Sequence, residues 1–155
     1  MGNPLFNNEN IEMGYHDRLS NLKKLVSLNT PLSIFCEDIS TEQVISTLND
    51  VFNNNISIID FDKISDYNNL HSKLSSSSDS LVYIFTNIES ISKVKDCEII
   101  KQSIYFLIDN EKYIYNGKYI DFSSLKKICI YKNRESIEKT IRIDWIYRKT
   151  FVINL

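Results

Sequence analysis

The sequence contains no alanine, and it has only three glycines and two prolines among its 155 residues. Glycine and proline in such low numbers exclude a collagen-like or linker-like chain. An excess of charge of one sign is also lacking, because 18 Lys and Arg stand against 20 Asp and Glu, for a net charge of -2. No global positive field therefore exists to draw the protein onto nucleic acid or an anionic membrane.

Long apolar runs and targeting segments are missing as well. No run approaches the roughly 18 apolar residues of a membrane span, and no secretory leader opens the chain. The three cysteines, Cys36, Cys97 and Cys129, form no Cys-x-x-Cys pair, which excludes a disulfide framework and a zinc knuckle. We expect a protein of the reducing cytoplasm, with no membrane partner, in which Cys36 and Cys129 pack in the core.

What the sequence does contain is enough apolar bulk for one core. Hydrophobic residues make up 43% of the chain and aromatic residues 12%, as in an ordinary globular domain. The length of 155 residues suits one domain of about 100–200 residues. We therefore expect a single domain over residues 1–155, led by a polar segment at residues 1–14.

The first half of the chain alternates runs of strand length with stretches of helical spacing. Ser40 or Thr41 is placed to cap a helix, and Ile56–Ile59 is typical of a strand buried on both faces. The expected elements are a helix at residues 19–26, a strand at Leu32–Cys36, a helix at Val44–Phe52, a strand at Ile56–Ile59, a short helix at Tyr67–Leu74 and a strand at Leu81–Phe85. Repeated strand–helix steps indicate a parallel sheet covered by helices.

The second half has a different pattern. Ser103–Ile108 and Lys112–Ile120 alternate like antiparallel strands, and Asn116-Gly117 is the strongest short hairpin signal. We therefore expect a projecting β-hairpin. After it, the pattern predicts a strand at Lys127–Tyr131, a helical turn at Glu135–Ile141 and a last strand at Thr150–Ile153. Because the sequence stops after that strand, we expect no lid domain.

A phosphate-binding loop is not recognisable after the first strand. Such a loop needs glycines, so that backbone N–H groups can surround the phosphates, and a lysine to neutralise them. Residues 36–43 contain neither, and their carboxylates would repel a triphosphate. His16 and His71 have no ligand or triad partner at a recognisable spacing. The sequence thus predicts no catalytic residue, no cofactor and no metal, and it disfavours ATP hydrolysis.

A group of acids is the one enzyme-like feature. Glu37, Asp38, Asp60 and Asp62 follow the first two strands, where open α/β sheets place their sites, and could hold Mg²⁺ for phosphoryl transfer. The other interpretation is that they cap helices and end loops in solvent. A receiver-type signalling domain would also use such acids, but it needs a phosphoacceptor aspartate after the third strand, where this chain has threonine and asparagine. A pseudo-receiver is therefore kept as an alternative.

Basic residues gather late in the chain, with aromatic residues between them. The basic residues are Lys132, Arg134, Arg142, Arg148 and Lys149, and the aromatic residues are Tyr131, Trp145 and Tyr147. Such a mixture is typical of an anion-binding or protein-interface patch. Because acids lie among them, solvated charges beside core aromatic residues are the alternative interpretation.

The order of these elements resembles the large ATPase subdomain of AAA+ proteins, most closely the RuvB-type Holliday-junction branch-migration motor. Leu81–Ser92 is similar to that family's Walker B strand, with Thr86 and Asn87 in place of its two acids. The Walker A loop of the family is absent between Pro31 and Gln43. The resemblance therefore implies the fold without implying ATPase activity.

Two later segments extend the resemblance. Ile128–Arg134 is similar to the sensor-1 strand, and Arg142 or Arg148 lies where the family carries its arginine finger. The resemblance implies a three-layer α/β sandwich around a mainly parallel five-stranded sheet of order 5-1-4-3-2. It also implies that the hairpin between Ser103 and Asp121 docks a partner protein.

We therefore predict a non-catalytic AAA+-like domain, a pseudo-ATPase, that serves as a protein-interaction or assembly module in a DNA-processing or other multi-subunit complex. The residues expected to bind the partner are Tyr113, Tyr115, Tyr119, Arg142 and Arg148, since tyrosine and arginine are favoured at interfaces. The alternation leaves open which hairpin face is exposed, or whether both are covered internally. A second copy of the chain is a further option as partner, whereas the charge does not support DNA.

Overall fold

The computed structural model describes Leu22, Lys24 and residues 30–76, 82–109, 113–120, 126–138 and 140–155. Its centre is a five-stranded sheet, all parallel, with the order β2-β3-β6-β1-β7. The strands are β1 (Leu32–Phe35), β2 (Ile56–Asp60), β3 (Val82–Thr86), β6 (Lys126–Tyr131) and β7 (Phe151–Asn154). Counted along the chain, this order is 5-1-4-3-2, which confirms the predicted α/β class and strand order.

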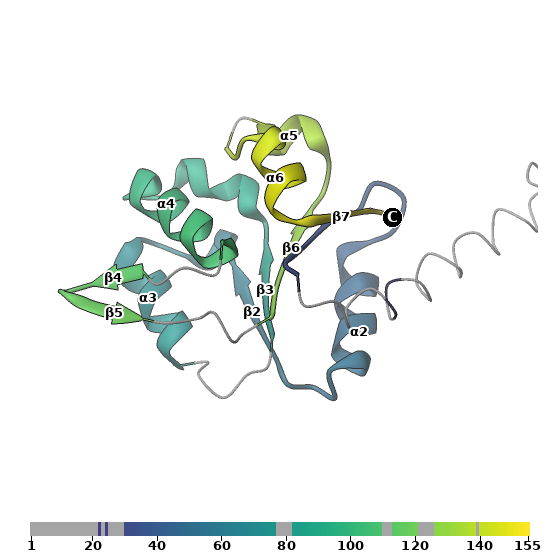
Figure 1. Cartoon of the computed structure of the whole chain (residues 1–155), viewed down its shortest axis with the longest axis horizontal. Coiled ribbons are helices and arrows are strands. Elements are labelled where there is room, and N and C mark those ends of the chain that lie inside the picture. Colours follow the sequence, from purple (N-terminus) through teal and green to yellow (C-terminus); the bar gives the residue numbers. More distant parts are fainter. Residues whose placement is uncertain are drawn as a thin grey trace, which may run out of the picture.

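Helices cover both faces of the sheet and make three layers, with α2 on one side and α3 and α4 on the other (Figure 1). The helices are α2 (Thr41–Val51), α3 (Tyr67–Ser76), α4 (Cys97–Ile108), α5 (Arg134–Glu138) and α6 (Ile143–Lys149), with the short 3₁₀ helices η2 (Phe61–Lys63) and η3 (Ile88–Lys93). None of the described helices is long and apolar enough to cross a membrane.

The sheet separates two buried clusters. On one face, Ile34 and Ile84 pack with residues of α2, and on the other Phe35 and Phe85 pack with residues of α3, α4 and α6. Successive residues of a strand point to opposite faces, and here both faces are covered. This explains why the central strands are continuously apolar in sequence.

Most elements lie close to where the sequence predicts them. α2 begins after Ser40, whose hydroxyl oxygen accepts the Gln43 backbone N–H at 3.2 Å while the Gln43 side chain accepts the Ser40 N–H at 3.3 Å. This reciprocal capping box explains the start of the helix. The predicted helix at residues 19–26 lies outside the described residues, except for Leu22 and Lys24, which are helical.

The prediction of a strand at Ser103–Ile108 is wrong, because these residues form the end of α4. Ile100, Ile104 and Leu107 are buried on one face of that helix, whereas Phe106 is 44% exposed. Burial at intervals of three and four residues is the helical period, which the local alternation obscures in a short window. The helical turn predicted at Glu135–Ile141 overlaps α5, whereas the sequence pattern assigns no element to the residues of α6.

The prediction that Ile56–Ile59 is buried on both faces is also wrong. β2 is an edge strand that pairs only with β3 in the described sheet. Ile59 is 1% exposed and Ile58 is 46% exposed, so one face of the strand is open. A continuous apolar sequence occurs in both central and edge strands. Whether one face or both faces of the strand are buried depends on its position in the sheet.

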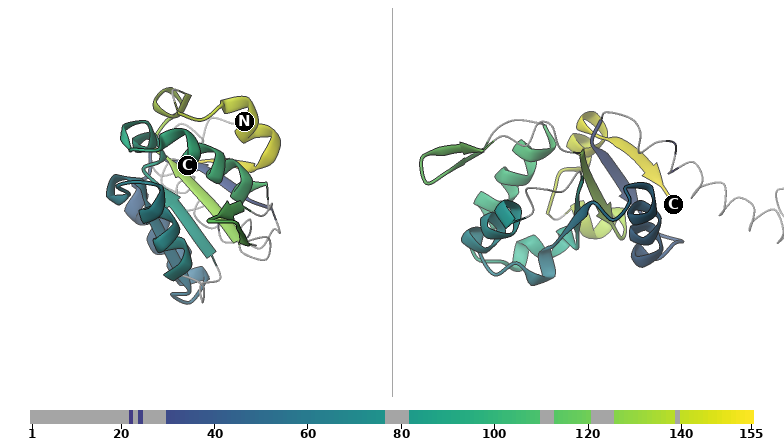
Figure 2. Two further views of the ribbon diagram at one scale, coloured as in Figure 1. Left: turned by 90° about the vertical axis from the view of Figure 1, so that its left-hand side faces the viewer. Right: turned by 90° about the horizontal axis from the view of Figure 1, so that it is seen from below.

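The predicted hairpin is confirmed at β4 (Tyr113–Tyr115) and β5 (Lys118–Ile120), and it projects from the body of the domain (Figure 1, Figure 2). Asn116 and Gly117 form its turn with φ of 50° and 79°. Positive φ at both positions is what a tight two-residue hairpin turn requires, and asparagine and glycine tolerate it.

The strand order contradicts the pseudo-receiver alternative. A receiver domain has the order 2-1-3-4-5, in which the first strand lies between the second and the third. Here β1 lies between β6 and β7, the last two strands of the sheet. The hairpin inserted between α4 and β6 also has no place in a receiver.

Candidate functional site

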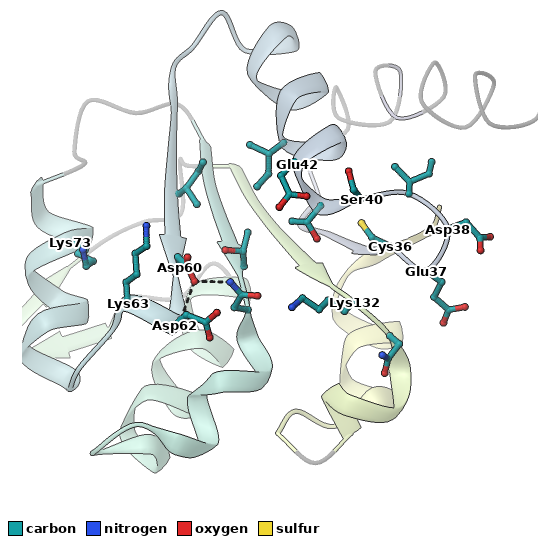
Figure 3. Close-up of a pocket in the computed structure, with 17 residues that line it drawn as sticks. Cys36, Glu37, Asp38, Ser40, Glu42, Asp60, Asp62, Lys63, Lys73 and Lys132 are labelled. Carbon is teal, nitrogen blue, oxygen red and sulfur yellow. Dashed lines mark hydrogen bonds between the residues drawn. The ribbon is translucent and has the colours of Figure 1, made fainter. Parts of the chain in front are cut away.

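A cleft of about 1010 Å³ opens at the carboxyl ends of β1, β2, β3 and β6 (Figure 3). Ligand sites of open α/β sheets lie at this edge. Its charged lining residues are Glu37, Asp38, Glu42, Asp60, Asp62, Lys63, Lys73 and Lys132. Ile45 and Ile58 add an apolar wall. The four acids that the sequence singles out are therefore brought to one cleft.

The first backbone N–H groups of the loop between β1 and α2 donate hydrogen bonds to other groups of the protein. The N–H groups of Glu37 and Asp38 donate to the carbonyl oxygen of Leu155 at 3.2 and 3.3 Å. The N–H of Gln43 is used by the Ser40 cap. These donors, which in a phosphate-binding loop would face the ligand, are thus satisfied within the chain.

Asp60, at the end of β2, and Asp62, in η2, act as structural acceptors. One Asp60 oxygen accepts the side-chain amide of Asn87 at 2.8 Å and the N–H of Asp62 at 2.9 Å, and Asp62 accepts the Ser90 hydroxyl. Asn87 has φ of 54°, a left-handed conformation that asparagine adopts more readily than most residues. The Asp60 carboxylate therefore caps η2 and ties the two strand ends together.

The acids do not converge on one point. Glu37 and Asp38 lie on the opposite side of the cleft from Asp60 and Asp62 (Figure 3). Among the described residues, no group of three or more His, Cys, Asp or Glu side chains is arranged to hold a metal ion. The geometry thus gives the Mg²⁺ alternative no direct support.

Cys36 lies at the wall of the cleft but is poorly suited to nucleophilic chemistry. Its side chain is buried, as predicted, and burial raises the pKa of its thiol from 9.0 to about 12. The thiolate is the nucleophilic form of cysteine, so the group is inert at neutral pH.

The hairpin is fastened to α3 through Tyr115. Its ring stacks on His71, with 3.6 Å between the centroids and 9° between the planes, and lies 5.5 Å from the ring of Tyr67. Its hydroxyl donates to the Asn68 side chain. Tyr115 is half-buried by these contacts. Tyr113 and Tyr119 are placed in β4 and β5, and their side chains lie outside the described part of the chain.

The late basic region divides between core and surface. Trp145 and Tyr131 are buried, whereas Arg142 and Arg148 are exposed and both pair with Asp144, at 3.1 and 3.6 Å. The alternative of solvated charges beside core aromatic residues thus describes this part of the region.

Arg134 is the exception, because aromatic rings hold it in place. Its guanidinium carbon lies 5.4 Å from the ring centroid of Phe35 and 5.5 Å from that of Tyr147, and it donates to Asn154 at 3.0 Å. Tyr147 is 46% exposed. Arg134 and Tyr147 therefore form an ordered surface feature, which the spacing of residues 134 and 147 does not reveal.

Sequence reasoning missed several cleft residues. Glu42 had a signal, because it stands in the first turn of the helix that follows the first strand. Lys73 and Lys132 come from α3 and from the end of β6, and only the fold brings them to the acids.

A scan against models of protein families gives no match, and a search of curated proteins finds no relative.

Proposed function

We propose that the protein is a non-catalytic AAA+-like domain that acts as a protein-interaction or assembly module. The observation that carries the proposal is the composition of the cleft where β1 meets α2. Glu37, Asp38 and Glu42 stand there, and no basic residue belongs to that loop or to the first turn of α2. Like charges within a few ångströms repel, so these carboxylates oppose a bound triphosphate.

The helix end offers no compensation for this repulsion. The N-terminus of a helix attracts anions through its unpaired N–H groups and its dipole. In α2 the Ser40 cap occupies one of these N–H groups, and Glu42 places a negative charge in the first turn. At the end of β3, Thr86 and Asn87 offer no carboxylate for Mg²⁺.

The first prediction concerns nucleotide binding. Titration calorimetry of the full chain with ATP and Mg²⁺ is expected to detect no binding with a dissociation constant below about 10 μM, equivalent to roughly 7 kcal/mol. A variant with Glu37→Gln, Asp38→Asn and Glu42→Gln is the matched control, since it removes the repulsion and keeps the size of the side chains. Tighter binding by the unaltered chain would contradict the pseudo-ATPase proposal.

The projecting hairpin is the contact surface that we propose first. The second is formed by the exposed Arg142, at the N-cap of α6, and Arg148, within α6. Among the described residues, Tyr115 joins the hairpin to the domain through the stack of its ring on His71. We propose that this contact holds the base of the hairpin while a partner binds the hairpin itself. In this role Tyr115 positions the hairpin, whereas Arg142 and Arg148 meet a partner directly.

The second prediction separates these two surfaces. Tyr115→Ser is expected to weaken capture of the native partner at least tenfold, because the hairpin loses its ring contacts with α3. Tyr115→Phe keeps the stack and should bind normally. Loss of the stack should lower the free energy of unfolding by only about 1 kcal/mol. If Tyr115→Ser binds normally while Arg142→Glu or Arg148→Glu does not, the contact lies on α6.

A further inference from the structure

Arg134 is an exposed arginine whose guanidinium group is held in place by three other side chains. Its guanidinium carbon lies over the rings of Phe35 and Tyr147, 5.4 and 5.5 Å from their centroids, and one of its N–H groups donates to the Asn154 side chain at 3.0 Å. These side chains come from β1, α6 and β7, so the fold itself fixes the position of the cation. A long side chain that is already ordered loses less conformational entropy when a partner binds it.

Arg134 differs from the other described arginines in having no carboxylate partner. Arg142 and Arg148 both pair with Asp144, at 3.1 and 3.6 Å. Glu138 follows Arg134 by four residues on α5, a spacing that permits an ion pair on a helix. Within the described ranges, however, no Asp or Glu forms an ion pair with Arg134. The guanidinium group is thus ordered while its charge is unpaired.

The remaining N–H groups of this guanidinium suit a carboxylate. Arginine has five N–H donors in a planar fork that matches the two oxygens of a carboxylate, and Asn154 uses one of them. Such two-bond contacts are among the stronger hydrogen-bonded pairs in proteins. Tyr147 is 46% exposed and places aromatic surface beside the cation. Arginine and tyrosine are enriched at the positions from which protein interfaces gain most of their binding energy.

The neighbouring charges favour a single carboxylate over a polyanion. Glu37 and Asp38 line a small cavity of about 350 Å³ together with Phe35 and Asn154, which both contact Arg134. A phosphate dianion or a nucleic-acid backbone at Arg134 would be repelled by these two acids. The chain as a whole has a net charge of -2, which does not attract nucleic acid. One Asp or Glu side chain carries a single charge and needs only the fork of Arg134.

We propose that Arg134 and Tyr147 dock a partner protein through one Asp or Glu side chain. The carboxylate accepts two N–H groups of Arg134, and an apolar side chain next to it packs on the exposed part of the Tyr147 ring. Phe35 and Asn154 act as positioning residues for the guanidinium group. This inference rests on the proposed function as an interaction module, and it adds a contact surface of stated chemistry to those proposed above.

The experiment selects peptides from a random heptapeptide phage library on the immobilised full chain. The expected consensus has one Asp or Glu next to an aromatic or aliphatic residue. No consensus, a basic one, or a run of several acids overturns the proposal. A selected peptide is then synthesised with a fluorophore, and its affinity for the full chain is measured by fluorescence polarisation. Replacing the acid of the peptide by the matching amide should weaken binding at least tenfold, and equal binding of the two peptides overturns the proposal.

Matched variants locate the bound peptide. Arg134→Leu keeps an aliphatic side chain over Phe35 and is expected to weaken peptide binding at least tenfold. Lys63→Leu is the control, because Lys63 is an exposed cation that follows β2, at the opposite edge of the sheet from β7. This control should change the affinity less than twofold. Equal affinities of the two variants overturn the proposal.

A further variant tests the charge of Arg134 without removing the arginine. Asn154→Asp keeps the size of the side chain and places a carboxylate on the guanidinium group, so that Arg134 is paired from within the protein. It should weaken peptide binding at least fivefold. If Arg134 had only a structural role, this variant would bind the peptide as the unaltered chain does, and that result overturns the proposal.

Nucleic acid is tested as the other kind of occupant. Binding of a short single-stranded DNA that is tighter than that of the peptide and is lost in Arg134→Leu would mean a nucleic-acid site and overturn the inference. Failure of all peptides while ATP still does not bind overturns the inference and leaves the proposed function intact, whereas ATP binding contradicts that function itself.

Discussion

Replacing Phe85 by alanine is expected to lower the free energy of unfolding by about 3–5 kcal/mol, the usual cost of removing a phenylalanine from a packed core. Phe85 is fully buried in β3, whose neighbours on both sides are β2 and β6. Its ring centroid lies 6.3 Å from those of Phe61 and Tyr83. The alanine side chain would leave a cavity that this surrounding sheet cannot close. Urea denaturation followed by circular dichroism measures the change.

Phe106→Ala is the matched control, because the same atoms are removed from a site that is 44% exposed. Its cost should stay within about 0.5 kcal/mol, as for surface substitutions in general. Similar losses in the two variants would mean that β3 is not the centre of the core.

Local chemistry predicts much of this fold correctly. β3 and β6 are buried on both faces, and their continuous apolar runs identify them in the sequence. α2 begins after Ser40, one of the two residues that the sequence offers as its cap. The hairpin turn follows from asparagine and glycine at adjacent positions. Each of these signals lies within a few residues of the structure that it specifies.

The failures concern features that depend on distant parts of the chain. Ile58 is exposed because β2 is at the edge of the sheet, which its own sequence does not show. Tyr115 packs on His71, far away in sequence, so alternation could not decide which way the ring points. The strand order, which puts β1 between β6 and β7, came from the family resemblance and not from periodicity.

The candidate site could be predicted only in part, because some of its contacts also join distant parts of the chain. Glu37, Asp38, Asp60 and Asp62 follow strands, and the carboxyl ends of parallel strands meet at one edge. Sequence therefore places the four acids at the cleft. It does not show that the Asp60 carboxylate accepts a hydrogen bond from the Asn87 side chain, 27 positions away. Nor does it show that Lys73 reaches the cleft from α3.

A second large effect is expected at alkaline pH, and it arises from the buried thiol of Cys129. Burial raises the pKa of this thiol from 9.0 to about 12, although a hydrogen bond from Tyr131 acts in the opposite direction. Burial also raises the pKa of Cys36 to about 12 and moves the pKa values of Tyr83 and Tyr131 upward. In each case the folded protein holds its proton at a pH where the unfolded chain releases it.

The sign of the effect follows from linkage between proton binding and folding. Below pH 9 the Cys129 thiol is protonated in both states and does not affect the free energy of unfolding. Between pH 9 and about 12 only the unfolded chain ionises, so the folded state loses stability as the pH rises. At pH 11 ionisation of this one thiol should lower the free energy of unfolding by about 3 kcal/mol, at roughly 1.4 kcal/mol for each pH unit above 9.

Urea denaturation at pH 7, 9, 10 and 11, with a reductant present, measures this loss of stability. Cys129→Val is the control, since it should unfold at lower urea at pH 7 yet lose about 3 kcal/mol less than the unaltered chain between pH 9 and 11. Equal slopes in the two proteins would show that Cys129 ionises without unfolding and that its burial is not what the structure describes.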